Sequence, residues 1–156
     1  MDRKSSPEEI AAIRQSFFDE GIIDQAQFEM LEGLADAEEP NFVEEVMKLF
    51  INDSKKQIDS VEQLMRTPII DSDEIDDILY QLKGSSASTG TIKIRNEVVK
   101  TRSYLEQGNI EGSKVAFEDL KIEHAIVKAK LESYFQVLKQ AKSAAGDGDD
   151  TSLPPK

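Results

Sequence analysis

Apolar residues recur at spacings of three and four along most of the chain, which is the period of one face of an α-helix. The first such stretch begins at Ser6-Pro7-Glu8-Glu9, which supplies an N-cap serine, a first-turn proline and a capping-box glutamate. This helix should end near Gly21, and Asp24 can cap a second one, with Phe28, Leu31 and Leu34 on its apolar side. The pattern therefore predicts two short helices at the beginning of the chain.

Four longer amphipathic stretches follow, bounded by Pro40, Pro68, Gly90 and Gly108. No alternating apolar and polar run competes as a β-strand. Four helices joined by short connections bury their apolar stripes best in an antiparallel bundle. We therefore predict an all-α fold, an antiparallel four-helix bundle preceded by two short helices. The four stripes are Phe42, Val46, Leu49 or Phe50, Ile58, Val61 and Leu64 or Met65; Ile75, Ile78, Leu79 and Leu82; Ile94, Val98, Thr101 and Leu105; and Ala116, Leu120, Val127, Leu131, Phe135 and Leu138.

The last residues of the chain differ in composition from the rest. Residues 141–156, AKSAAGDGDDTSLPPK, are mostly small and polar and contain almost no large apolar side chain. Such a segment buries too little apolar surface to offset the entropy lost on ordering. We predict a single domain over residues 1–140 and a disordered tail over 141–156.

Composition narrows the possible functions. The 156 residues carry 19 basic and 31 acidic side chains, a formal net charge of −12, which disfavours binding to nucleic acid or to an anionic membrane. The chain has no cysteine and one histidine, His124, so thiol chemistry and multi-histidine metal sites are excluded. We assign no metal and no cofactor. No stretch is apolar enough for a membrane helix or a secretory signal, so we expect an intracellular protein.

The segment from Tyr80 to Gly90, YQLKGSSASTG, is unusual for a helix. A glycine inside a helix costs about 1 kcal/mol relative to alanine, and serine and threonine compete for the backbone. At about 100° per residue, Tyr80 points away from the apolar stripe and should face solvent. Gly84 follows one turn later on the same face and leaves a notch beside residue 80, whereas Ser86 joins the apolar stripe and is expected to serve packing.

This segment resembles the signature of histidine-containing phosphotransfer (HPt) proteins, His-x-Leu-Lys-Gly-Ser-Ser followed by a glycine. The matching residues are Leu82, Lys83, Gly84, Ser85, Ser86 and Gly90. The segments 40–46 and 131–135 also resemble plant members, and the likeness covers residues 20 to 138. The resemblance implies an HPt-like helical bundle that is not an enzyme and that works with the receiver domains of sensor histidine kinases and response regulators.

The sequence departs from this family at the position that carries the chemistry. Tyr80 stands where the family has its phospho-accepting histidine. A neutral imidazole is a competent nucleophile at pH 7, whereas a phenol stays protonated and needs an activating base. Asp76 and Asp77 lie within one turn, but solvent-facing carboxylates are poor bases for a phenol. His124 lies on or beside an apolar stripe without a neighbouring Lys and Gly, so we interpret it as a structural residue.

The substitution resembles plant pseudo-HPt proteins, in which the histidine is replaced and docking persists. It implies a negative regulator of a cytokinin-type phosphorelay that carries no phosphoryl group. We expect the protein to be a monomer in the cytoplasm and nucleus. Residues 83–102 contain five basic side chains against Glu97, which suits a partner with an acidic pocket, although such charges also occur on ordinary solvated helices. We predict a docking surface formed by Tyr80, Gln81, Lys83, Gly84, Arg95 and Arg102.

Two other functions remain open at this level. The chain could be an active phosphorelay carrier, if the natural protein has histidine at position 80 or if another residue accepts the phosphoryl group. It could also be a plain helical scaffold unrelated to signalling. The scaffold hypothesis is the weakest, because it leaves Gly84 and the serine run unexplained.

Overall fold

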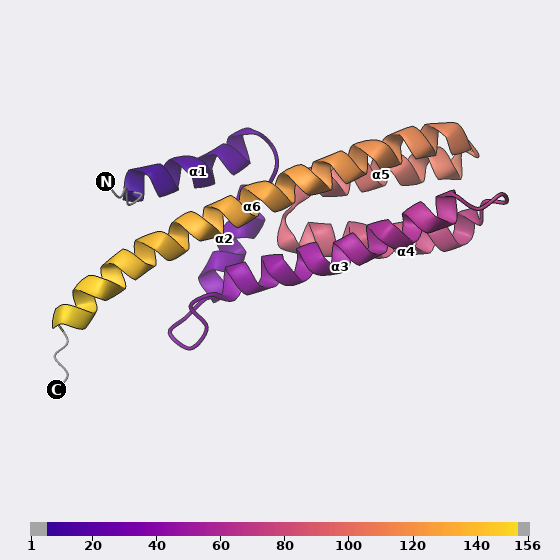
Figure 1. Ribbon diagram of the computed structural model, residues 1–156. Coiled ribbons are helices and arrows are strands. Elements are labelled where there is room, and N and C mark those ends of the chain that lie inside the picture. Colours follow the sequence, from indigo (N-terminus) through magenta and orange to yellow (C-terminus); the bar gives the residue numbers. More distant parts are fainter. Residues whose placement is uncertain (1–5, 153–156) are drawn as a thin grey trace.

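The structure, a computed structural model, describes the backbone of residues 6–152 and the side chains of residues 6–143. Within these residues the chain forms helices and no strand (Figure 1). The helices are α1 (Pro7–Asp19), α2 (Gln25–Leu34), α3 (Phe42–Met65), α4 (Ser72–Thr89), α5 (Ile92–Glu106) and α6 (Ile110–Ser152). The predicted all-α fold is confirmed.

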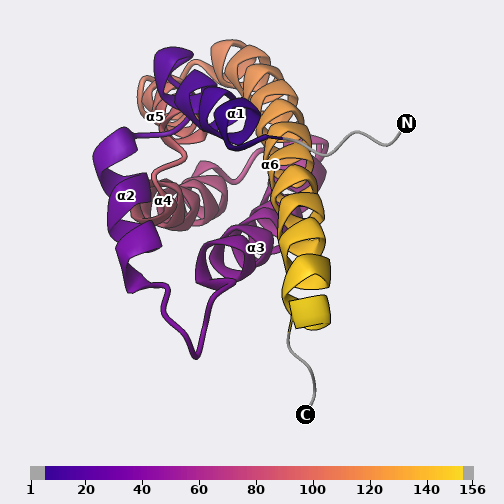
Figure 2. The same ribbon diagram turned by 90° about the vertical axis from the view of Figure 1, so that its left-hand side faces the viewer.

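Helices α3 to α6 form the predicted antiparallel bundle. Successive helices run in opposite directions, and α3 packs against both α4 and α6 while α5 packs between α4 and α6 (Figure 1). The two short helices lie outside this bundle: α1 runs along α6, and α2 contacts α3 and α4 (Figure 2). The outer face of α4 therefore stays uncovered along most of the helix.

One continuous hydrophobic core joins all six helices. Phe17 of α1 and Phe28 of α2 are almost completely buried, and Phe17 packs edge-on against Tyr134 of α6 with ring centroids 5.3 Å apart. The sequence left open whether Leu49 or Phe50 belongs to the apolar stripe; Phe50 does, since it is buried and Leu49 is exposed. The prediction that Leu34 faces the core is wrong: it is 56% exposed, because it is the last residue of α2 and lies beyond the bundle.

The predicted helix starts are confirmed by capping contacts. Ser6 and Glu9 form a capping box at α1, and the side chains of Asp24 and Asp71 accept backbone hydrogen bonds at the starts of α2 and α4. Asp24 also donates its backbone N–H to the carbonyl of Gly90, at 2.8 Å. This last bond ties the start of α2 to the end of α4.

The end of the chain differs from the sequence prediction. The backbone is helical to Ser152, where we expected a disordered tail from residue 141. Ala141, Lys142, Ala144 and Ala145 are good helix formers, and no proline occurs between Pro68 and Pro154, so α6 can continue past the core. Residues 153–156 lie outside the described residues. Among the helices described, none is long and apolar enough to cross a membrane.

Candidate functional site

The middle of α4 presents opposite faces to the core and to solvent. Leu79 and Leu82 are completely buried, whereas Tyr80 between them is 61% exposed, as predicted. Gln81 and Gly84 are also exposed and Lys83 is half-buried. The exposed face therefore holds the four α4 residues of the predicted docking surface.

Gly84 lies in open space. A Cβ atom added there would meet no atom within 4 Å, and the residue has ordinary helical geometry without a positive φ. Neither packing nor backbone conformation in this chain requires a glycine at this position. The missing side chain leaves the α4 backbone accessible to a partner, as the sequence pattern predicted.

Tyr80 is in contact with Arg102, which is itself held by Asp76. The guanidinium carbon of Arg102, from α5, lies 5.0 Å from the centre of the Tyr80 ring, within cation–π range. Arg102 also donates two hydrogen bonds to Asp76, one turn before Tyr80, at 2.8 and 3.2 Å. The hydrogen bond with Asp76 raises the pKa of Arg102, so the guanidinium stays charged. This role of Asp76 was not predicted, although its spacing of four residues from Tyr80 places both on one face.

Arg102, Lys83 and Asp76 also line a shallow groove between α4 and α5. The groove has a volume of about 500 Å³, and its wall includes Val99, which is 40% exposed. Arg95 precedes Val99 by one turn and shares its helical face, but no described contact joins Arg95 to Tyr80. Arg102 thus belongs to the centre of the surface and Arg95 to its margin.

Gln81 lies on the other side of Tyr80, toward α3. Gln57 of α3 donates its side-chain N–H to Oε1 of Gln81 over 3.4 Å, a weak hydrogen bond. The exposed face that holds the predicted docking residues therefore extends from the edge of α3, across α4, to α5.

The basic charge of residues 83–102 is smaller than the sequence count suggests. Lys93, Lys100 and Arg102 each have acidic partners, whereas no described ion pair involves Lys83 or Arg95. Most of these acids come from outside the counted segment, so a count along the chain could not include them. The pairs are Lys93 with Glu123, Lys100 with Glu97 and Asp119, and Arg102 with Asp76.

The hydroxyl groups after Gly84 serve the helix itself. Ser86 is buried and donates to the carbonyl of Leu82 at 2.8 Å, and Thr89 bonds to the carbonyls of Ser85 and Ser86. These contacts confirm the packing role predicted for Ser86. Tyr80 is the exposed side chain at the centre of the face.

His124 is buried in the bundle, away from the outer face of α4. It is 3% exposed, and its Nε2 lies 2.7 Å from the hydroxyl of Ser54 on α3. Burial lowers the pKa of His124, and the charges of Lys55 and Lys128 act in the same direction. The structural role predicted for this histidine is confirmed. In the described part of the chain, no three His, Asp or Glu side chains gather as a metal site.

Comparisons with known proteins agree with this arrangement. No model of a protein family matches the chain. The chain is 38% identical over 140 residues to pseudo histidine-containing phosphotransfer protein 2 of Oryza sativa subsp. japonica, covering 90% of this chain and 92% of the relative. It is 41% identical over 117 residues to histidine-containing phosphotransfer protein 4 of Arabidopsis thaliana, covering 75% of this chain and 91% of the relative.

Solved structures show the same relationship. A histidine-containing phosphotransfer protein from Medicago truncatula matches with a TM-score of 0.82 and 30% identity, over 88% of this chain and 92% of the other. A putative histidine-containing phosphotransfer protein from rice matches with a TM-score of 0.79 and 29% identity, over 86% and 94%. Sequence and fold together establish that the chain belongs to the plant histidine-containing phosphotransfer family.

Proposed function

We propose that this chain is a pseudo-phosphotransfer protein of a multistep phosphorelay. It binds the receiver domains of sensor histidine kinases and response regulators but carries no phosphoryl group, and so acts as a negative regulator of cytokinin-type signalling. The observation that carries the proposal is Tyr80, which occupies the exposed centre of the α4 face. We extend the proposal to a monomer that works in cytoplasm and nucleus.

The chemistry around Tyr80 supports binding without transfer. Transfer to a phenol requires a base that removes its proton, because a phenol is a weak nucleophile near pH 7. Asp76 is the acidic residue one turn before Tyr80, and both of its oxygens accept hydrogen bonds from Arg102. It is therefore poorly placed to act as the base. An aryl phosphate would also be a much poorer phosphoryl donor to a partner aspartate than a phosphoramidate.

A phosphotransfer assay tests the central claim. A phosphorylated receiver domain is mixed with this protein, and the label on the protein is measured beside its competition against an active HPt protein. We expect competition without label. Label on the wild-type chain would overturn the proposal in favour of an active carrier, and absence of competition would remove the inhibitory role.

The variant Tyr80→His isolates the missing group. We expect it to gain transfer from the phosphorylated receiver domain, because an imidazole would then occupy the exposed centre of the docking surface. Acid-labile label on the variant measures the gain. If the variant binds receivers but accepts no phosphate, features other than Tyr80 block transfer.

The variant Gly84→Gln tests the notch as a contact point. The glutamine side chain fits the free protein, since nothing lies within 4 Å of its Cβ position, but it would separate a partner from the α4 backbone. We expect receiver affinity to fall about tenfold or more, measured by calorimetry, with helicity unchanged or higher. Gly33→Gln is the matched control, because Gly33 of α2 also lies in open space outside the docking surface. Equal affinity of both variants would contradict a role for Gly84 in docking.

A further inference from the structure

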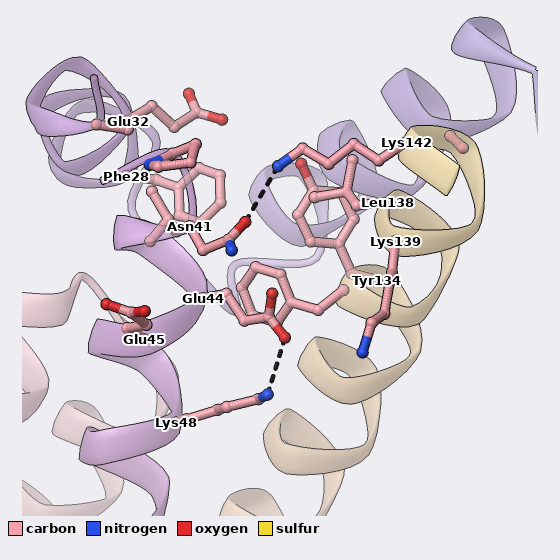
Figure 3. A pocket seen from close by; sticks show the side chains of 15 residues that line it. Phe28, Glu32, Asn41, Glu44, Glu45, Lys48, Tyr134, Leu138, Lys139 and Lys142 are labelled. Atoms are coloured by element: carbon pink, nitrogen blue, oxygen red, sulfur yellow. Dashed lines mark hydrogen bonds and ion pairs between the residues drawn. The ribbon is translucent and has the colours of Figure 1, made fainter. Parts of the chain in front are cut away.

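A second concave site lies between α2, α3 and α6, and none of the docking surface residues line it. The cavity has a volume of about 760 Å³, within the usual range for small-molecule sites (Figure 3). Three aromatic side chains, Phe28, Tyr134 and Phe135, form much of its wall, and all three are buried. The cavity therefore offers an aromatic floor that opens to the surface.

The hydroxyl of Tyr134 has no described hydrogen-bond partner, although the residue is only 4% exposed. Its ring is fixed by Phe17 and Phe135, whose centroids lie 5.3 and 5.4 Å away, and by Phe28 at 6.4 Å. Figure 3 shows the hydroxyl pointing into the space where the ammonium group of Lys142 ends. In the described part of the chain, the fully buried side-chain oxygens without a partner belong to Glu97 and Glu123, so the Tyr134 hydroxyl reaches the open space of the cavity and is available to a ligand.

The charges around the cavity leave a positive group beside this hydroxyl. Glu44 is paired with Lys48 at 2.9 Å, and Glu32 is paired with Arg14 at 2.6 Å. Lys142, by contrast, donates to the neutral side chain of Asn41 at 3.0 Å. The cavity wall contains two more charged residues without a described ion pair, Lys139 and Glu45, and in Figure 3 the carboxylate of Glu45 points away from the cavity.

We propose that this cavity binds a small planar aromatic molecule that carries a carboxylate or sulfonate. The aromatic part packs against Phe28, Tyr134 and Phe135. The acidic group accepts hydrogen bonds from the Tyr134 hydroxyl and the Lys142 ammonium, which lie on the same side of the cavity (Figure 3). The Lys142 ammonium has no described acidic partner, and its positive charge favours an anion over a neutral or cationic ligand.

Two fluorescent probes with the same ring system test the proposal on the full chain. 8-Anilino-1-naphthalenesulfonate carries a sulfonate, and N-phenyl-1-naphthylamine lacks it. We expect one saturable site for the sulfonate probe and binding about a hundredfold weaker for the neutral probe, because the neutral probe makes neither of the two charge-assisted contacts. Two-dimensional NMR spectra of the protein should place the shifts of the sulfonate complex in α2, the start of α3 and the second half of α6.

Matched variants then test the two donors. Lys142→Gln and Tyr134→Phe should each lower the affinity for the sulfonate probe about tenfold and leave the affinity for the neutral probe unchanged. Lys56→Gln is the control, because this substitution removes the same charge from an exposed residue that does not line the cavity. Circular dichroism and thermal melting confirm that each variant is folded. The proposal is overturned if both probes bind equally, if the control weakens the sulfonate probe as much as Lys142→Gln, or if the shifts map elsewhere.

Discussion

At the scale of single residues, the exposed ring of Tyr80 is oriented by its contact with α5. The guanidinium carbon of Arg102 lies 5.0 Å from the centre of the Tyr80 ring, and Asp76 accepts two hydrogen bonds from that guanidinium. The ring is therefore oriented even though it is 61% exposed. An oriented ring loses less conformational entropy when a partner covers it, so Arg102 prepares Tyr80 for binding.

A double-mutant cycle measures this interaction. We expect the changes in unfolding free energy for Tyr80→Ala and Arg102→Ala to be non-additive, with a coupling of about 0.5–1 kcal/mol from the cation–π contact. Urea unfolding of the single and double variants gives the coupling. The loss of the Arg102 contact to Asp76 occurs in both legs of the cycle and cancels. A parallel cycle with Arg95→Ala should show no coupling, and an equal value there would contradict the contact.

The helical period predicts on which face of its helix a side chain lies, but not which residues far away in the sequence it contacts. Tyr80, Leu82 and Ser86 face the predicted directions, because 100° per residue fixes orientation within one helix. The contact between Tyr80 and Arg102 depends on how α4 and α5 are aligned, which a single sequence does not specify. The ion pairs that reduce the basic charge were missed for the same reason.

At the scale of the element, α4 combines two glycines with different roles. Gly84 lies within the helix in open space, whereas Gly90 ends it with a φ of +77°. A Cβ atom at Gly90 would also lie 3.0 Å from Cβ of Gln27, which belongs to α2. The first glycine is dispensable for the fold, and the second is required by it.

Alanine substitutions at these two positions should therefore have opposite effects on stability. Gly84→Ala is expected to raise the free energy of unfolding by about 1 kcal/mol, because alanine is the better helix former. Gly90→Ala is expected to lower it by about 1–2 kcal/mol, because the left-handed conformation is costly for any residue with a Cβ. Urea unfolding measures both changes. Destabilisation by Gly84→Ala would show that the fold itself needs this glycine.

Helix boundaries were predictable where a side chain defines them. Ser6 and Asp24 cap the helices that they were expected to cap, since capping is a local interaction. The end of α6 was not predicted. Composition argued for disorder after residue 140, while the local preference of residues 141–145 for helix favours the continuation seen in the structure.

At the scale of the whole molecule, the amphipathic stripes were sufficient to predict the bundle. Each stripe is apolar along one side only, and an antiparallel bundle is the simplest arrangement that buries all four. The cavity at α2 could not be predicted in this way. The cavity is lined by Val43 of α3, by Phe135 and Leu138 of α6, and by Phe28 of α2. Its shape therefore depends on the position of α2, which is bonded to the end of α4.

The bundle also buries one titratable group that should set its response to acid. His124 of α6 contacts Ser54 of α3, and burial together with Lys55 and Lys128 holds the pKa of His124 below its ordinary value. A backbone hydrogen bond with Ile51 and the charge of Asp59 act in the opposite direction on this pKa, but both influences are smaller. In the unfolded chain the same imidazole returns to its ordinary pKa of about 6.5.

This difference predicts how stability changes with pH. Between the lowered pKa of folded His124 and about pH 6.5, the unfolded chain binds a proton that the folded chain does not, so the free energy of unfolding falls as the pH falls. One such proton accounts for up to about 1.4 kcal/mol per pH unit in that range. Urea unfolding between about pH 7.5 and 5.5 should therefore show a steeper loss of stability for the wild type than for His124→Gln, which keeps a polar group near Ser54 without a titrating one. The two proteins are compared by the slope of their free energy of unfolding against pH, because the substitution can also shift stability equally at every pH. Parallel slopes would show that His124 titrates alike in the folded and unfolded chain, and that the acid response of the bundle comes from its carboxylates.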